Sequence, residues 1–200
     1  MRLSFFLTFI FLSSGAYAQK FPFEYWHEGK IVLETGDTLR GNVKYDLQSD
    51  LLEFEKSNKL ESFTARKVLF FQIFDKTVTS YRSFYSLPYT VSGGYRAPVF
   101  FELLTEGKMT LLCREVVELR SYPSSFYYYG SSSRQVLVYH YFILKDNGTI
   151  EPFGGKKSDL LNMMGNYGDT VEAYMKKNKL KVDEKYHLAG IVEYYNSLYK

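Results

Sequence analysis

The sequence predicts an α+β fold, in which an antiparallel β-sheet or barrel-like region is followed by a tail of two or three helices packed on it. Residues 38–46 alternate apolar and polar side chains with the period of two that marks a half-buried strand. After 154 the apolar spacing changes to i, i+3 and i+4, as in Val171, Tyr174 and Met175. We therefore expect an antiparallel β domain over residues 19–153 and a helical region over 154–200, with the boundary at Gly154-Gly155.

The first hairpin of the sheet is expected within residues 30–46. A three-residue loop over 36–38 places Leu33 opposite Gly41 and Ile31 opposite Val43, which keeps the apolar side chains on one face. A two-residue loop would mix the two faces. The side chains expected to point inward are Ile31, Leu33, Leu39, Val43 and Tyr45.

Further strands are predicted over 51–55, 60–65, 68–74, 77–84, 99–105, 108–115, 135–145 and 149–153. The first two are joined across Ser57-Asn58. The strands over 99–105 and 108–115 flank a two-residue turn at Glu106-Gly107, and this register places Phe101 opposite Leu112. Long loops are expected over 85–98, which contains two prolines and two glycines, and over 122–134, which is rich in serine and tyrosine.

Three helices are expected in the tail. Ser158 is predicted to cap a helix that runs through Met164, Asp169 to cap a second, and Asp183 to cap a third. The third helix carries the longest apolar stripe, made by Leu188, Ile191, Val192, Tyr195 and Leu198.

Residues 1–18 have the pattern of a secretory signal peptide. A basic start at Arg2 precedes an apolar run of about 10 residues, against the roughly 20 that cross a bilayer, and Ala16-Tyr17-Ala18 forms a cleavage site. We expect an exported protein that is periplasmic, at the cell surface or extracellular, with no transmembrane span after signal cleavage. Its net charge of +3 is too small to indicate nucleic-acid binding.

The sequence contains no spacing typical of a catalytic, metal or cofactor site. The three histidines are scattered and Cys113 is the single cysteine, so neither a zinc motif nor a nucleophile motif is present. We expect His140 to be a hydrogen-bonded core residue and Cys113 a buried thiol. Asp37, Asp46 and Asp50 are interpreted as turn residues. No catalytic residue, metal or cofactor is therefore predicted.

Two aromatic-rich loops are the candidate binding residues. With 19 Tyr and 17 Phe, aromatic side chains are the unusual feature of the composition. Rings presented by loops stack on sugars or anchor a protein partner, whereas the alternative is that they fold back over the end of the sheet. The candidates are Tyr89, Tyr95, Phe126, Tyr127, Tyr128 and Tyr129.

The pattern W-x-x-G-x-I-x-L-x-x-G-D-T-L-x-G-x-V-x-Y-D runs from Trp26 to Asp46, and the chain ends in Tyr194-Tyr195-Asn196-Ser197-Leu198. Together these segments resemble uncharacterised secreted proteins of Bacteroidetes-type gram-negative bacteria. The resemblance implies a periplasmic or cell-surface location and supplies no catalytic residues.

The function expected from the sequence is that of an exported, non-catalytic envelope protein that binds a protein or a small ligand. One alternative is a carbohydrate-binding module that uses the aromatic loops, so the partner is an envelope protein or a glycan. Another is an enzyme whose site is not visible in the sequence. An outer-membrane barrel is disfavoured by the helical tail.

Overall fold

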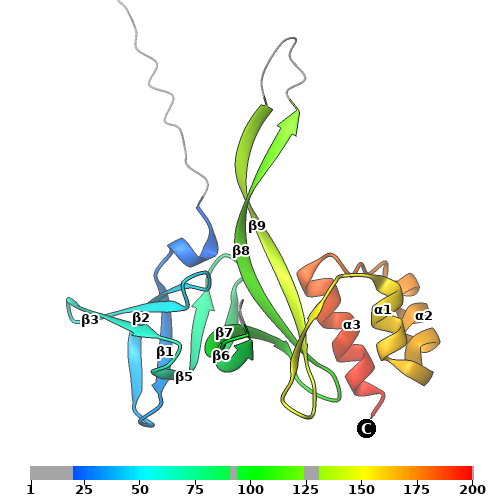
Figure 1. Ribbon diagram of the computed structural model, residues 1–200, viewed down its shortest axis with the longest axis horizontal. Coiled ribbons are helices and arrows are strands. Elements are labelled where there is room, and N and C mark those ends of the chain that lie inside the picture. The colour runs from blue at the N-terminus through cyan, green and yellow to red at the C-terminus, as the bar shows by residue number, and fades with distance from the viewer. Residues whose placement is uncertain (1–19, 91–93, 124–130, 200) are drawn as a thin grey trace, which may run out of the picture.

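The computed structural model describes residues 20–90, 94–123 and 131–199. Within them the chain forms one ten-stranded antiparallel sheet and three α-helices that pack on it (Figure 1). The strand order is β10-β9-β8-β7-β6-β5-β1-β2-β3-β4, so consecutive strands are neighbours except where β1 lies between β5 and β2. The α+β expectation is confirmed. The sheet is open rather than a closed barrel, because β10 and β4 form its two separate edges.

The elements follow one another in hairpins and then in short helices. In chain order they are η1 (Pro22–Glu24), β1 (His27–Leu33), β2 (Thr38–Asp46), β3 (Leu51–Lys56), β4 (Lys59–Thr64), β5 (Val68–Asp75), β6 (Ser80–Thr90), β7 (Arg96–Thr105), β8 (Thr110–Pro123), β9 (Ser131–Leu144), β10 (Ile150–Phe153), α1 (Lys157–Met163), η2 (Gly165–Tyr167), α2 (Gly168–Asn178) and α3 (Lys185–Ser197).

The register predicted for the first hairpin is wrong, although its faces are right. Ile31 pairs with Leu39, not with Val43, and the three-residue loop covers 34–36. Gly36 has a φ of +90°, which suits the last loop residue of a turn closed by a bulge. The partner of Ile31 moves by an even number of residues, so the same side chains stay on the same face. All five expected inward residues consequently lie in one apolar cluster.

The same even shift occurs in the hairpin of β7 and β8. Leu112 pairs with Leu103 rather than with Phe101, and a bulge interrupts the pairing between Leu103 and Thr105. Phe101 and Leu112 nevertheless share a face and a cluster. By contrast, the turn at Ser57-Asn58 is confirmed. Both residues have positive φ, as a two-residue turn of this kind requires.

Both predicted long loops are shorter than expected. β6 continues to Thr90 and β7 starts at Arg96, with Pro88 opposite Pro98. A non-hydrogen-bonded pair of an antiparallel ladder needs no N–H from either residue, so two facing prolines fit there. β8 likewise reaches Pro123 and β9 starts at Ser131, with ladder pairs along the whole length of both strands.

Apolar side chains form three clusters on the two faces of the sheet. On β7, Val99 and Phe101 point to the cluster on one face, where Phe142 and Ile150 also lie. Phe100 and Leu104 point to the other face. Phe100 belongs to the cluster over β1–β7, and Leu104 packs against the cluster under the helices. Glu102 lies between Phe100 and Leu104 on that second face. A charged residue therefore separates two apolar clusters.

Polar side chains hold α3 against the sheet at both of its ends. Lys185, in its first turn, donates a 2.8 Å hydrogen bond to Glu102. Near its last turn, Asn196 bonds the backbone N–H and C=O of Met109 at 2.8 and 2.9 Å. The predicted caps are wrong, because the residues at the cap positions are Lys156, Tyr167 and Glu184, none with a side-chain cap bond. The predicted apolar stripe of α3 packs in the cluster under the helices, and so do Val171 and Met175 of α2, whereas Tyr174 is only half-buried.

Replacing Gly29 by alanine tests how tightly β1 packs against β5. A Cβ at this position would lie 2.5 Å from the backbone oxygen of Gln72. We expect Gly29→Ala to lower the free energy of unfolding by about 1–3 kcal/mol, because the backbone of a central strand has to move. Chemical denaturation measures this. Gly154→Ala is the control, since nothing lies within 4 Å of its Cβ. Equal losses in the two variants would contradict the prediction.

Candidate functional site

Five charged side chains are buried together under α3, at the boundary between two apolar clusters. They are Asp75 on β5, Arg82 on β6, Glu102 on β7, Glu115 on β8 and Lys185 on α3, each 6% exposed or less. We call them the ionic cluster. Burying a charge is costly unless it is paired and hydrogen-bonded. Their contacts therefore decide whether these groups are structural or available for chemistry.

Arg82 lies at the centre of the ionic cluster. Its Nη1 donates to Asp75 at 2.9 Å, its Nε and Nη2 bind Glu102 at 2.9 and 2.7 Å, and Nη2 also donates to Glu115. The contact with Glu102 is bidentate, which suits the planar fork of a guanidinium. One side chain thus connects carboxylates from three different strands.

Tyr45 is hydrogen-bonded to the ionic cluster from β2, and Lys185 is the member of the cluster that lies on a helix. Tyr45, on β2, accepts a hydrogen bond from Arg82 at 2.8 Å and donates one to Glu115 at 2.9 Å. Lys185 Nζ lies 2.8 Å from Glu102 and 3.8 Å from Glu115. Because four strands separate β2 from β8 in the sheet order, the contact between Tyr45 and Glu115 requires the sheet to curl over itself.

The contacts within and around the ionic cluster lower the pKa values of two of its carboxyls, those of Glu102 and Asp75. Burial alone would raise the pKa of Glu102, but Arg82 and then Lys185 lower it below its ordinary value. Burial is likewise opposed at Asp75, where hydrogen bonds from Thr77 and Arg82 lower the pKa of the carboxyl. Burial is also the largest cause of the strongly raised pKa of Tyr45, which keeps its hydroxyl protonated as a donor to Glu115. These groups therefore serve as hydrogen-bond and ion-pair partners for one another.

A second polar contact closes the curl of the sheet next to the ionic cluster. Arg114 on β8 donates to Asp50 at 2.8 Å, and Asp50 also accepts the backbone N–H of Phe100 at 2.7 Å. Interpreting Asp50 as a turn residue is therefore incomplete, because its carboxylate bridges β7 and β8. Asp46 does act as a turn residue, since it accepts the backbone N–H of Gln48 at 2.8 Å.

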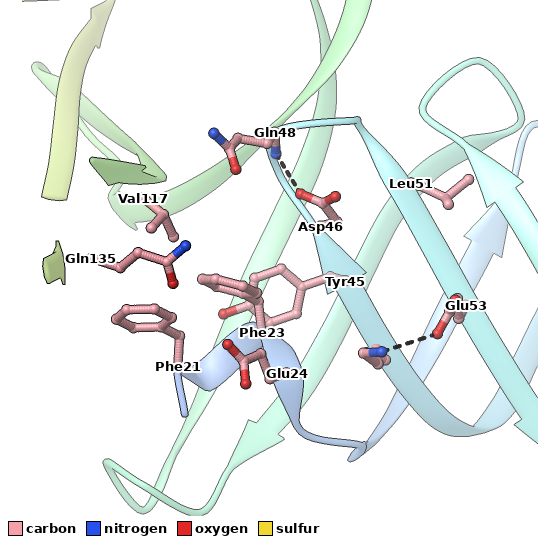
Figure 2. A pocket seen from close by; sticks show the side chains of 11 residues that line it. Phe21, Phe23, Glu24, Tyr45, Asp46, Gln48, Leu51, Glu53, Val117 and Gln135 are labelled. Carbon is pink, nitrogen blue, oxygen red and sulfur yellow. Dashed lines mark hydrogen bonds and ion pairs between the residues drawn. The ribbon is translucent and has the colours of Figure 1, made fainter. Parts of the chain in front are cut away.

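The candidate functional site is a pocket of about 400 Å³ beside the ionic cluster. It lies between η1, the turn end of the β2–β3 hairpin and the β8–β9 hairpin, and Figure 2 shows its lining. Phe21 and Phe23 stack with ring centroids 5.5 Å apart, and Phe23 meets Tyr45 edge-on at 6.5 Å. His27 supports η1 by donating a 2.7 Å hydrogen bond to the carbonyl of Pro22. The aromatic side of the pocket is thus held by defined contacts.

Polar groups line the rest of the pocket. The amides of Gln48 and Gln135 and the carboxylate of Glu24 lie around the aromatic rings (Figure 2). Lys44 and Glu53 form a half-exposed ion pair at 3.5 Å at the side of β3. Amides donate and accept hydrogen bonds, and carboxylates accept them. A few polar groups around an apolar surface are typical of a small-molecule site.

The aromatic residues predicted as a site are not brought together where they are described. Tyr89 is half-buried and packs edge-on against Phe101 and Phe142, with centroids 5.5 and 5.6 Å away. Tyr95 is exposed, and its hydroxyl accepts a hydrogen bond from Arg66 at 2.5 Å. Phe126, Tyr127, Tyr128 and Tyr129 lie outside the described residues.

The interpretation of His140 as a core residue is wrong, whereas that of Cys113 is confirmed. His140 is exposed, with Nε2 3.6 Å from Glu118, because it lies where the β8–β9 hairpin leaves the sheet. Cys113 is fully buried, and burial raises the pKa of its thiol well above the ordinary value. Over 20–90, 94–123 and 131–199, no three or more His, Cys, Asp or Glu side chains are grouped as a metal site.

Sequence reasoning missed both the ionic cluster and the pocket. One signal was present, since Glu102 interrupts the apolar run from Val99 to Leu104 at an inward position. A charge inside such a strand indicates a buried partner. The partner itself is not visible, because Arg82 lies 20 residues away and Lys185 83 residues away.

Replacing Arg82 tests whether the ionic cluster holds the fold. Arg82→Met leaves three buried carboxylates with Lys185 as their remaining cation. We therefore expect the free energy of unfolding to decrease by about 3–5 kcal/mol. Arg120→Met is the control, because Arg120 pairs at 3.2 Å with Glu118 on the surface and should cost at most about 1 kcal/mol. Denaturant titration measures both variants. Similar small losses would contradict a structural role for Arg82.

The lowered pKa values predict how stability depends on pH. A carboxyl whose pKa is lower in the folded state stabilises the fold above its unfolded pKa, and this contribution is lost as the pH falls through the folded pKa. We expect the free energy of unfolding to decrease as the pH is lowered below about 4. Asp75→Asn should be less stable at neutral pH and should show a shallower fall, whereas Asp146→Asn, at an exposed turn, should follow the parent curve. A parallel curve for Asp75→Asn would contradict this expectation.

None of the helices in the described ranges combines the length and the apolar character that a membrane crossing needs. Comparison with protein-family models, with curated proteins and with solved structures found no match for this chain.

Proposed function

We propose that this protein is an exported, non-catalytic envelope protein that binds a small polar ligand in the pocket between η1, β2–β3 and β8–β9. Export is inferred from the leader-like residues 1–18 and from the resemblance to secreted Bacteroidetes-type proteins. Binding is inferred from the pocket. The observation that carries the proposal is the meeting of stacked aromatic rings with amide and carboxylate groups around one open volume.

The lining favours a sugar among small polar ligands. The C–H face of a pyranose packs on an aromatic surface, while its hydroxyls both donate and accept hydrogen bonds. Gln48 and Gln135 offer amides, and Glu24 and Asp46 offer acceptors. Among the described residues, the carbohydrate-binding alternative is therefore carried by this pocket, while Phe126, Tyr127, Tyr128 and Tyr129 lie outside them.

The ionic cluster favours binding over catalysis. An acid or base in catalysis needs a carboxyl that is free to exchange a proton with the substrate. Asp75 and Glu102 are instead held by Arg82 in short hydrogen bonds, with their pKa values lowered. Tyr45 joins this cluster to the pocket, and its raised pKa fixes the hydroxyl as a donor to Glu115. The cluster acts as the rigid wall behind the pocket.

Sugar binding by two pocket variants tests this proposal. We expect a glycan array, followed by calorimetric titration of any hit, to give binding that Phe23→Ala and Gln135→Ala weaken at least about tenfold, because each removes a contact worth about 1.5 kcal/mol. Tyr25→Ala is the matched control. It is an exposed aromatic residue one position after η1, and it does not line the pocket.

Two outcomes would overturn the proposal. Binding that Phe23→Ala and Gln135→Ala leave unchanged would place the ligand elsewhere. Turnover of a bound glycan that is lost in Glu24→Gln would instead support an enzyme. Near-native denaturation curves for the two pocket variants are required, so that a loss of binding is not a loss of fold.

A further inference from the structure

The outer edge of β9 is only partly covered by β10. β9 runs from Ser131 to Leu144, whereas β10 pairs only with Tyr141–Leu144. Towards Ser131, no strand in the part of the chain that the structure describes pairs with this edge of β9. The β8–β9 hairpin here projects beyond the rest of the sheet (Figure 1). An open strand edge presents a row of N–H and C=O groups to an added strand.

The ladder shows which groups of β9 face outward. Lys145 N–H donates to Thr149 O at 2.9 Å, which marks a hydrogen-bonded pair at the turn. Such pairs alternate along an antiparallel ladder, so Tyr141, opposite Phe153, also directs its backbone groups towards β10. By the same alternation Tyr139 and Leu137 direct theirs outward, beyond the end of β10.

A pocket of about 520 Å³ lies across this edge, at the point where β10 ends. Tyr139 and Tyr141 line it from one face of β9, and His140 and Phe142 from the other. Gly155, with a φ of +74°, lies where the chain turns away from the sheet towards α1. A Cβ at this glycine would meet nothing within 4 Å. The volume is therefore open to a chain that approaches along the edge.

Two polar groups of this pocket have no partner. Tyr141 is 7% exposed, and its buried hydroxyl makes no hydrogen bond within the described residues. Asp183 is exposed and, in the same residues, forms no ion pair, while the neighbouring Lys181 pairs with Glu184 at 3.0 Å. A buried hydroxyl without a partner is uncommon and costs free energy. Solvent does not reach the hydroxyl of Tyr141, so Asp183 is the group of the two that a ligand can contact.

We propose that the edge of β9 from Leu137 to Tyr141 binds an extended polypeptide segment that carries a lysine or arginine side chain. The segment adds as a strand beyond β10 and bonds the outward backbone groups of Leu137 and Tyr139. Its basic side chain enters the pocket, where the exposed carboxylate of Asp183 supplies the opposite charge. The aromatic walls pack against the apolar stem of that side chain. This site is separate from the pocket beside η1.

The test titrates the full chain, labelled with nitrogen-15, with a blocked nine-residue peptide of alternating threonine and valine around a central lysine. We expect the amide signals of Leu137 and Tyr139 to shift. A matched peptide with norleucine in place of lysine should bind about two- to fivefold more weakly, as an exposed ion pair predicts. Asp183→Asn should remove that difference, and Asp159→Asn, on the surface of α1, should keep it.

Two further variants separate the edge from the pocket. Leu137→Pro removes an outward N–H without removing a bond to β8, so both peptides should stop binding. Tyr141→Phe should leave the binding of both peptides unchanged, and should leave the free energy of unfolding unchanged or raised, because the lost hydroxyl is buried and has no partner in the described residues. Phe23→Ala, in the other pocket, should leave peptide binding unchanged.

Equal binding of both peptides to the parent chain and to Asp183→Asn would overturn the proposal, as would shifts confined to the pocket beside η1. Analytical ultracentrifugation measures whether a second copy of the chain, rather than a different polypeptide, occupies the edge. Dimerisation that Leu137→Pro abolishes, without any peptide binding, would assign the edge to self-association and would also overturn the proposal.

Discussion

The fold depends on how Arg82 neutralises carboxylates from neighbouring strands. Asp75, Glu102 and Glu115 would each be costly to bury alone, and the guanidinium reaches all three. With Lys185, two cations face three carboxylates, so hydrogen bonds must supply the remaining stabilisation. Thr77 provides two of them to Asp75, and Tyr45 provides one to Glu115. Several contacts thus fix the position of each group. Because they join β2 to β6 and β8, they also hold the sheet in its curled form.

The pocket beside η1 is a consequence of that curl. Tyr45 connects β2 to β8 through Glu115, which brings the β2–β3 hairpin close to the β8–β9 hairpin. Residues from β2 and β9, at distant places in the strand order, can line one volume only because the open sheet curls strongly. The ion pair between Arg114 and Asp50, in the β2–β3 turn, holds the same curl. Gln135 and Asp46 thus lie around a common space without any direct bond between them.

The sequence predicts faces better than it predicts partners. Alternation places Ile31, Val43 and Tyr45 on the inner face, and an even slip of register does not move them. Register itself depends on the turn, and the turn at Gly36 needs a left-handed residue at a position that alternation cannot identify. The ionic cluster is harder still, because Tyr45 and Glu115 are 70 residues apart. The site beside η1 was missed for the same reason.

The β8–β9 hairpin contributes residues to both proposed binding surfaces. The two surfaces are separate because the hairpin is packed differently near the sheet and further along. Near the sheet, Cys113 and Tyr141 pack beneath the helices while Leu112 and Phe142 pack on the opposite face, so this part is buried on both sides. Further along, β7 and β10 no longer accompany the hairpin, and a two-stranded ribbon alone is only marginally stable in water. One face of the ribbon gains support from η1 and the aromatic pocket. Within the described residues the β9 edge has no such support, and an added strand would stabilise the part of the hairpin that the sheet leaves uncovered.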